Sequence, residues 1–376
     1  MKKQFICLML LALTATLPSC DLFNPDDDSE DNIVLVNSDI TTPTVWLASN
    51  TYIVETSINI DGTTLTIEPG TTIKFSAGAY LSVGQHNNVT FIANGTPEKP
   101  IIFTSNSATP APGAWWGLWF YSNTLSNSSM SYCEVKYAGQ YDSEAISVEA
   151  KMTMINCTVK YAKKIGIKST EGFVLFTGNT IEDIGTHAIS INAKGVHTIG
   201  EGNQITCGSN YGILVNYSQI EEPVLWKEQT VPYYLESPLD IDNAFTLMPG
   251  VTIKFNANGD IEFGKNNNTT FTAVGTLEKP IVFTTAASSP APGAWYGLYF
   301  YSNLSSNSKM KYCIVEYAGK DYDRANLNLY ELNGFTIENC TIRNSSGYGI
   351  YSSNSIWSNL SNIFTGNAWA NVHSVN

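Results

Sequence analysis

The sequence predicts an all-β fold: a single-stranded right-handed parallel β-helix that is duplicated internally. Three observations predict it. Short runs of alternating apolar and polar residues follow one another along the chain, separated by Gly, Asn, Pro or Ser. Similar residues recur at steps of 22 to 24 positions. After the N-terminal apolar run, no stretch has the 3.6-residue periodicity of an amphipathic helix.

The recurrence is clearest in small and amide residues. Asn156, Asn179 and Asn203 are 23 and 24 residues apart, and Cys133 and Cys157 are 24 apart. Strands of a few residues at this period form coils that cannot bury an apolar face alone and therefore stack. Every second side chain then points inward. A β-sandwich would have longer strands and a propeller would repeat near 40 residues, so the period favours the β-helix.

A long internal duplication lies within this pattern. Residues 69–139 align without gaps with residues 249–319, and 43 of the 71 positions are identical. Weaker likeness extends outward, which predicts two related halves of about 45–222 and 223–376 within a body of residues 32–376. The length alone suggests several domains, but the duplication favours one continuous rod. At ~4.8 Å per coil, equivalent positions would lie about eight coils, or ~38 Å, apart.

Residues 1–19 predict a lipoprotein signal peptide. Lys2 and Lys3 precede an apolar run over residues 5–17, which is short for a membrane-spanning helix. The run ends in Leu-Pro-Ser immediately before Cys20, which resembles the lipobox of bacterial lipoproteins. That resemblance implies that Cys20 is diacylated, as by palmitate, and anchors the chain stably. An ordinary secretory signal with an incidental Cys is the alternative.

Residues 20–31 predict the lipidated Cys followed by an acidic tether. Six of the eleven residues after Cys20 are acidic, so this segment is expected to be solvated. An acidic stretch in this place resembles the export signal of surface-displayed lipoproteins of Bacteroidota; a plain spacer is the other interpretation. We therefore expect a monomeric outer-membrane lipoprotein, exposed on the cell surface and held to the membrane through its lipid.

The composition excludes several classes of protein. The chain has 376 residues, a formal net charge of −13 and 12% aromatic residues. The aromatic content is too high for a disordered chain. A nucleic-acid partner is excluded because it would require a basic surface. Without the signal peptide and the tether, the body carries 27 acidic and 18 basic residues, a milder net charge of −9.

Two segments of the first half carry a family resemblance. Residues 64–75 and 95–104 resemble the opening coils of bacterial right-handed parallel β-helix proteins, many of them Bacteroidota lipoproteins. The resemblance covers nearly all of the body and implies the fold. The same fold carries pectate lyases, polygalacturonases, alginate and chondroitin lyases and phage tailspikes. It therefore implies only a role involving glycans, and only by analogy.

Residues for catalysis or metal binding are sparse. His187 lies in a segment, 185–191, that is nearest to the Gly-His-Gly turn of polygalacturonase-type β-helices, although an ordinary turn and strand explains it. Arg324 is one of two arginines and a candidate lyase base. Asp321 and Asp323 are weak candidates for Ca²⁺, which needs six to eight oxygen ligands. We predict no cofactor, and whether the protein is an enzyme stays open, with the balance against it.

The sequence offers better candidates for glycan binding than for catalysis or metal binding. Alternation in residues 115–121 places Trp116, Leu118 and Phe120 on one face. If that face is the core, the other face and its counterpart in the second half present four aromatic rings that could stack on sugars: Trp119, Tyr121, Tyr299 and Tyr301. Packing beneath the adjacent loop is the alternative, and a one-residue bulge would reverse the faces.

Function and thiol state are left with open alternatives. The favoured interpretation is a non-catalytic rigid rod that binds glycans or mediates surface contacts. A polysaccharide lyase or glycoside hydrolase, and a structural spacer or display protein, are the others. Five cysteines lie in the body, and a buried ladder or disulfides would explain them: Cys133, Cys157, Cys207, Cys313 and Cys340.

Overall fold

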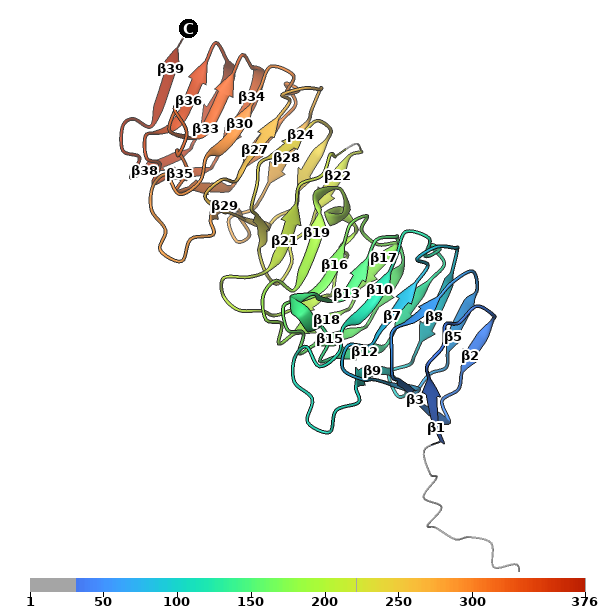
Figure 1. The fold of residues 1–376 in the computed structure, drawn as a ribbon. Coiled ribbons are helices and arrows are strands. Elements are labelled where there is room, and N and C mark those ends of the chain that lie inside the picture. The colour runs from blue at the N-terminus through green and yellow to red at the C-terminus, as the bar shows by residue number, and fades with distance from the viewer. Residues whose placement is uncertain (1–31, 221, 376) are drawn as a thin grey trace, which may run out of the picture. The chain divides into compact units, whose positions relative to one another are not determined.

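The structure is a computed structural model that describes residues 32–220 and 222–375. The chain divides into units 1–31 and 32–376, so the predicted signal peptide, Cys20 and the tether lie outside the described residues. The regular secondary structure of the second unit is almost entirely short strands in five sheets, joined by turns and loops, and every strand pair is parallel (Figure 1). This confirms the predicted right-handed parallel β-helix. The described ranges contain no helix long and apolar enough to cross a membrane.

The first half uses three sheets. Sheet 1 has eight strands: β1 (Asn32–Val36), β3 (Asn50–Val54), β6 (Thr72–Phe75), β9 (Ile101–Ser105), β12 (Cys133–Lys136), β15 (Thr158–Lys160), β18 (Thr180–Glu182) and β20 (Gln204–Ile205). Sheet 3 has six: β2 (Thr44–Trp46), β5 (Thr64–Ile67), β8 (Thr90–Asn94), β11 (Ser129–Ser131), β14 (Thr153–Ile155) and β17 (Leu175–Thr177). Short 3₁₀ helices interrupt the coils at η1 (Gln140–Asp142) and η2 (Ala193–Thr198).

Sheet 2 runs through both halves. Its thirteen strands are β4 (Ile58–Ile60), β7 (Tyr80–Val83), β10 (Gly117–Phe120), β13 (Glu144–Val148), β16 (Ile165–Ser169), β19 (Ile189–Asn192), β21 (Ile213–Asn216), β23 (Tyr233–Leu235), β26 (Thr252–Phe255), β29 (Ile281–Thr285), β32 (Cys313–Glu316), β35 (Thr341–Arg343) and β38 (Ile363–Thr365).

The second half adds two sheets of six strands. Sheet 4 contains β22 (Val224–Trp226), β25 (Phe245–Leu247), β28 (Phe271–Val274), β31 (Lys309–Lys311), β34 (Asn333–Glu338) and β37 (Ile356–Leu360). Sheet 5 contains β24 (Leu239–Ile241), β27 (Asp260–Phe263), β30 (Gly297–Phe300), β33 (Ala325–Tyr330), β36 (Tyr348–Ser353) and β39 (Val372–Val375).

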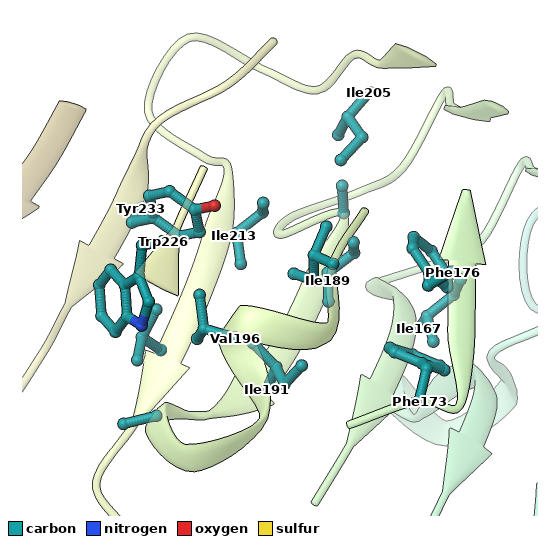
Figure 2. Close-up of a cluster of buried hydrophobic side chains, with 14 of the residues drawn as sticks. Ile167, Phe173, Phe176, Ile189, Ile191, Val196, Ile205, Ile213, Trp226 and Tyr233 are labelled. Carbon is teal, nitrogen blue, oxygen red and sulfur yellow. The ribbon is translucent and has the colours of Figure 1, made fainter. Parts of the chain in front are cut away.

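The core lies inside the coils, where inward side chains from successive coils stack. Phe75 packs on Trp115 and, in the second half, Phe255 packs on Trp295, each with ring centroids 4.0 Å apart. Burial of these large rings, together with the many buried Ile, Val and Leu side chains, favours stacking of the coils. Figure 2 shows the core where the halves meet, with Trp226 beside Tyr233.

Amide side chains stabilise the turns between coils. The Asn179 side-chain oxygen accepts a hydrogen bond from the Cys157 backbone N–H at 2.9 Å. The Asn203 side-chain oxygen accepts one from the Asn179 N–H at 3.0 Å. Asn179 is 1% and Asn203 4% exposed. The 24-residue spacing of Asn179 and Asn203 therefore reports a real ladder, in which each amide satisfies a buried backbone group of the preceding coil. Asn156 is exposed and outside this ladder, because the register places Cys157 at the position of Asn179.

The five cysteines of residues 32–375 are free thiols, so of the two explanations that the sequence left open, disulfides are not what the structure shows. Cys133 and Cys157 occupy adjacent coils, as do Cys313 and Cys340, and all four are at most 1% exposed. Cys207 is partly exposed. The four buried thiols donate to backbone carbonyls, Cys133 to Ala93 at 3.1 Å among them. They therefore behave as small, satisfied core residues.

The two halves use different sheets for equivalent strands. β6 and β26 have the same sequence, Thr-Ile-Lys-Phe, but β6 belongs to sheet 1 and β26 to sheet 2. Likewise β10 belongs to sheet 2 and its counterpart β30 to sheet 5. The change occurs in the coil from β21 to β23, which contains only β22, whereas the coil from β7 to β10 contains two strands. Equivalent surfaces of the halves therefore lie on different sheets.

Candidate functional site

The outer surface of sheet 2 in the first half carries a group of aromatic side chains. On β7 and β10 the inward residues Leu81, Val83, Leu118 and Phe120 are completely buried. Trp119 alternates with them and is partly exposed, as the alternation predicts, and Tyr121 just beyond the strand is partly exposed too. Leu118, Trp119 and Phe120 therefore alternate between the inner and the outer face as expected. No bulge in β10 reverses the two faces.

The prediction for Trp116 is wrong. It was expected on the inner face with Leu118 and Phe120, but it lies outside and is partly exposed. The strand begins only at Gly117, whose φ of 154° and close approach to the Ala145 carbonyl break the alternation. Trp115 takes the core position instead, and its indole N–H donates to the Lys136 carbonyl at 2.7 Å.

We name the group of five aromatic residues the aromatic face: Tyr80, Trp116, Trp119, Tyr121 and Tyr141. Tyr80 stacks on Trp119 with centroids 5.5 Å apart and planes 24° from parallel. Trp116 meets both of these rings edge-on, at 5.0 and 5.2 Å. Tyr141, on η1, is 72% exposed and lies 5.7 Å from Trp116. The rings therefore form one connected surface in contact with solvent.

Polar atoms without partners lie beside this surface. The Trp119 Nε1, the Gln140 Oε1 and the Ser82 Oγ are buried and have no hydrogen-bond partner within the described residues. Ser82 lies opposite Trp119 on the neighbouring strand. Unsatisfied buried polar groups cost free energy and are uncommon in folded proteins. Such a cluster next to exposed rings is typical of a surface that receives a hydrogen-bonding ligand or ordered water.

The equivalent positions of the second half carry different chemistry. Alignment of the two halves places Asp260 at Tyr80, Glu262 at Ser82 and Tyr299 at Trp119. Strand register places Asp240 at the position of Asn59. We name the acidic face by its members: Asp240, Asp260, Glu262, Tyr299, Tyr301 and Asp321. The core residues beneath the two faces remain apolar in both halves, so the outer surface alone has changed character.

Tyr299 and Tyr301 hydrogen-bond to carboxylates of this face. The Tyr299 hydroxyl donates to Asp321 at 2.9 Å and the Tyr301 hydroxyl to Glu262 at 3.1 Å. Tyr299 is only 5% exposed, so its ring offers almost no surface to a sugar. Tyr301 is partly exposed and stacks on Tyr330 at 5.4 Å. The expectation that Tyr299 presents an open ring is therefore corrected: its polar end is engaged and its ring is covered.

Two carboxyl groups of the acidic face, Asp240 and Asp260, have raised pKa values. Burial raises the pKa of Asp260 to about 7, and the nearby charges of Glu262 and Asp240 add to the effect. Burial and then Glu262 raise the pKa of Asp240 as well. Lys265 pairs with Glu262. Because charged carboxylates in a low-dielectric setting repel one another, Asp260 keeps a proton near neutral pH that an ordinary Asp would have lost.

A hollow of about 730 Å³ adjoins the acidic face and brings together three sequence candidates, Arg324, Asp321 and Asp323. It is lined by Lys320, Asp321, Tyr322, Asp323, Arg324, Tyr348, Tyr351 and Trp369. The Arg324 guanidinium lies 5.3 Å from the centre of a Trp369 ring. Asp323 accepts a hydrogen bond from Tyr330, as Asp321 does from Tyr299. Across the described ranges no three His, Cys, Asp or Glu side chains form a group that could hold a metal ion.

His187 lies elsewhere, just before β19 of sheet 2. Its Nδ1 accepts a hydrogen bond from the Gly212 backbone N–H at 3.3 Å, and its ring packs edge-on against Tyr211 and Tyr234. Burial lowers its pKa. It does not line the hollow that contains Arg324. The two catalytic candidates are therefore not brought together, and His187 has the contacts of a structural residue.

Sequence reasoning missed several members of both faces: Tyr80, Trp116, Tyr141, Asp240, Asp260 and Glu262. The signal that could have found them is the duplication itself. Where 43 of 71 aligned positions are identical, the substitutions of Tyr80 by Asp260 and of Ser82 by Glu262 stand out as changes of chemistry. Both fall on outward positions of a strand whose inward positions stay apolar, which locates the changed surface.

The comparisons with known proteins support the fold. The model of a pectate-lyase-like β-helix domain matches residues 38–147, which span β2 to most of β13. Neither the curated proteins nor the solved structures gave a match. The match agrees with the parallel sheets of the structure. Since β-helices of this kind carry many unrelated functions, it describes the scaffold and leaves the chemistry to the two faces.

Proposed function

We propose that this protein is a non-catalytic, lipid-anchored cell-surface lipoprotein whose β-helix binds glycans through the aromatic face. The observation that carries the proposal is the connected group of partly exposed rings around Tyr80, Trp116 and Trp119. The lipid anchor and the surface location rest on Cys20 and its flanking sequence alone. The aromatic face supports a binding role because its rings lie on rigid strands and lose little conformational entropy on binding.

The geometry suits a pyranose ring. The apolar C–H face of a sugar can cover an indole ring and bury a large area, since Trp and Tyr combine broad apolar surfaces with a polar edge. Sugar hydroxyls both donate and accept hydrogen bonds. They could therefore satisfy the unpartnered Trp119 Nε1 and Gln140 Oε1 at the border of the face. A ligand of this kind gains affinity from contacts that the free protein leaves incomplete.

A glycan array with the full-length protein, purified in detergent, tests the proposal. We expect retention of one class of neutral glycan. Trp119→Ala should weaken that retention at least about tenfold, a loss typical of removing one stacked ring. Tyr217→Ala is the matched control, because Tyr217 is 57% exposed and belongs to neither face. Equal retention by the wild type and Trp119→Ala, with unchanged melting temperatures, would remove the aromatic face as the site.

A polysaccharide lyase or glycoside hydrolase is the second candidate, and the acidic face favours it. A carboxyl group whose pKa lies at about 7, as for Asp260, can give up or take a proton near neutrality, which general acid–base chemistry requires. The same array incubations, read for released oligosaccharides, separate the candidates. Product release that Asp260→Asn abolishes would establish the enzyme. Retention without any product supports the binding protein.

A further inference from the structure

The second half contains a buried polar side chain whose hydrogen-bonding groups are all unused. Asn328 is 1% exposed, and neither its Oδ1 nor its Nδ2 has a partner within the described residues. It lies opposite Tyr299 on the neighbouring strand of sheet 5. An amide that is buried without partners loses hydrogen bonds to water and gains none in return.

Gly297 has no side chain and leaves space between the Asn328 amide and the carboxyl group of Asp260. A Cβ atom at Gly297 would lie 3.0 Å from the Asn328 Nδ2, so the amide points toward the space that glycine leaves free. Gly297 lies opposite Asp260 on β27. Asp260 is 8% exposed, and its Oδ1 is also without a partner. Two unsatisfied polar side chains therefore flank the same glycine on successive coils.

The charge of this region is unbalanced. Asp240 and Glu262 lie opposite each other on adjacent strands. The negative charges of Glu262, Asp240 and Asp321 all act on Asp260. Lys265 pairs with Glu262, and Lys320 and Arg324 line the hollow beside Asp321, so the cation placed directly against Asp240, Asp260 and Glu262 is Lys265. The fold does not need these acids, because the first half builds the same strands with Asn59, Tyr80 and Ser82. Acids that destabilise the empty face are expected where a positively charged ligand offsets them.

The chemistry of the occupant follows from these groups. Carboxylates accept hydrogen bonds, and an ammonium group supplies three donors with a positive charge. The Asn328 Nδ2 faces the space at Gly297 and can donate to a hydroxyl of the same sugar. A metal ion is not favoured, since no suitable group of ligands occurs in the described part of the chain. The adjoining hollow of about 730 Å³ contains the rings of Tyr348 and Trp369 and is large enough for a sugar. Together these features fit a ring that carries a primary amine.

We propose that the acidic face of the second half binds amino-sugar glycans through their free ammonium groups, which donate hydrogen bonds to Asp260 and Glu262, while the Asn328 Nδ2 donates to a hydroxyl of the same sugar. This inference rests on the proposed glycan-binding function and gives the second half a ligand class of its own. The duplication then provides two different binding faces on one rod: a neutral aromatic face on sheet 2 and an acidic face on sheet 5.

Isothermal titration of the full-length protein tests the proposal at about pH 6.5, where amino-sugar amines carry substantial positive charge. The probes are a β-1,4-linked glucosamine hexamer and its fully N-acetylated counterpart. We expect the free amine to bind at least about tenfold more tightly, which is the magnitude of one charge-assisted hydrogen bond. Asp260→Asn and Glu262→Gln should each weaken the glucosamine hexamer at least about tenfold. Glu278→Gln removes an exposed acid outside the acidic face and should leave its affinity unchanged.

The outcomes distinguish this inference from the proposed function. Trp119→Ala should leave glucosamine binding intact while it removes neutral glycans. If neutral glycans bind and the glucosamine hexamer does not, the inference is overturned and the aromatic site stands. If the glucosamine hexamer binds and no array glycan depends on Trp119, only the aromatic site is lost. Equal affinity for both hexamers, or equal affinity for hexalysine, also overturns the inference. Because Asp260→Asn removes an unfavourable charge, we expect that variant to fold, which its melting temperature verifies.

Discussion

At the scale of residues, the two faces differ in how far their outward side chains destabilise the folded protein. The acidic face places Asp260 near Asp240 and Glu262, and burial together with these charges raises its pKa to about 7. The first half has Tyr80 in that place and carries no such charge. The sequence predicted Trp119 and Tyr121 on the outer surface from alternation alone. It could not predict that Tyr299 is buried, because that depends on Asp321 in a loop of the next coil, to which its hydroxyl donates.

Replacement of Asp260 by Asn should stabilise the protein above neutral pH. A carboxyl whose folded-state pKa is raised favours folding most when it is protonated, so its contribution falls as pH rises from about 4 through 7. The wild type should therefore lose roughly 3 kcal/mol across this interval relative to Asp260→Asn. Urea unfolding at several pH values measures the difference. The charged groups facing Asp260 are Glu262, Asp240, Asp321 and Lys265.

Asp61→Asn is the control of opposite sign. The pKa of Asp61 is lowered, because its carboxylate accepts hydrogen bonds from the backbone and side chain of Asn87. Its contribution is present above the ordinary Asp pKa and is lost as pH falls through the lowered value. Asp61→Asn should thus destabilise at neutral pH, where Asp260→Asn stabilises. Parallel pH profiles for the two variants would contradict the assignment of a raised pKa to Asp260.

At the scale of elements, strand parity was predictable and strand boundaries were not. Leu118 and Phe120 lie in the core because the side chains of β10 alternate from Leu118 onward. Trp116 does not follow, since Gly117 begins the strand in a conformation that interrupts the alternation. A glycine in this place is explained by the neighbouring coil: at Gly117 a Cβ would lie 2.7 Å from the Ala145 carbonyl oxygen, and at Gly297 2.8 Å from that of Ala325.

Gly297→Ala should therefore destabilise the second half by about 2 kcal/mol, from backbone strain at φ 143° and the contact with the Ala325 carbonyl. Thermal unfolding measures it. Gly208→Ala is the matched control, because its added methyl meets only the Tyr211 side chain and its backbone has no positive φ. If both variants melt alike, close packing between the coils does not explain the conserved glycine of the two halves.

At the scale of the whole molecule, the duplication does not repeat one surface along one line. The 180-residue offset predicted equivalent patches at a regular separation, which would favour avidity on a polymer. The structure corrects this, because equivalent strands occupy different sheets, β10 in sheet 2 and β30 in sheet 5. The 22- to 24-residue repeat could not reveal this change of sheet, since the coil from β21 to β23 has nearly normal length but one strand fewer. Two different ligands suit this arrangement better than two copies of one ligand.

The proposed membrane anchor rests on the sequence of the N-terminal segment. Cys20→Ser removes the sulfur that would carry the lipid, so the variant should move from the membrane fraction to the soluble fraction. Immunoblotting of fractionated cells measures this, with Cys207→Ser as a control that leaves the lipobox-like sequence intact. Continued membrane association of Cys20→Ser would refute the lipid anchor.

The stoichiometry of neutral oligosaccharide binding tests the central claim most directly, since that claim assigns the binding of neutral glycans to the first half alone. Calorimetric titration of the full-length protein with an oligosaccharide selected on the array should give one site per chain. That site should be lost in Trp119→Ala and retained in Tyr299→Phe. Two equivalent sites per chain, or a site that depends on Tyr299 and not on Trp119, would contradict the account.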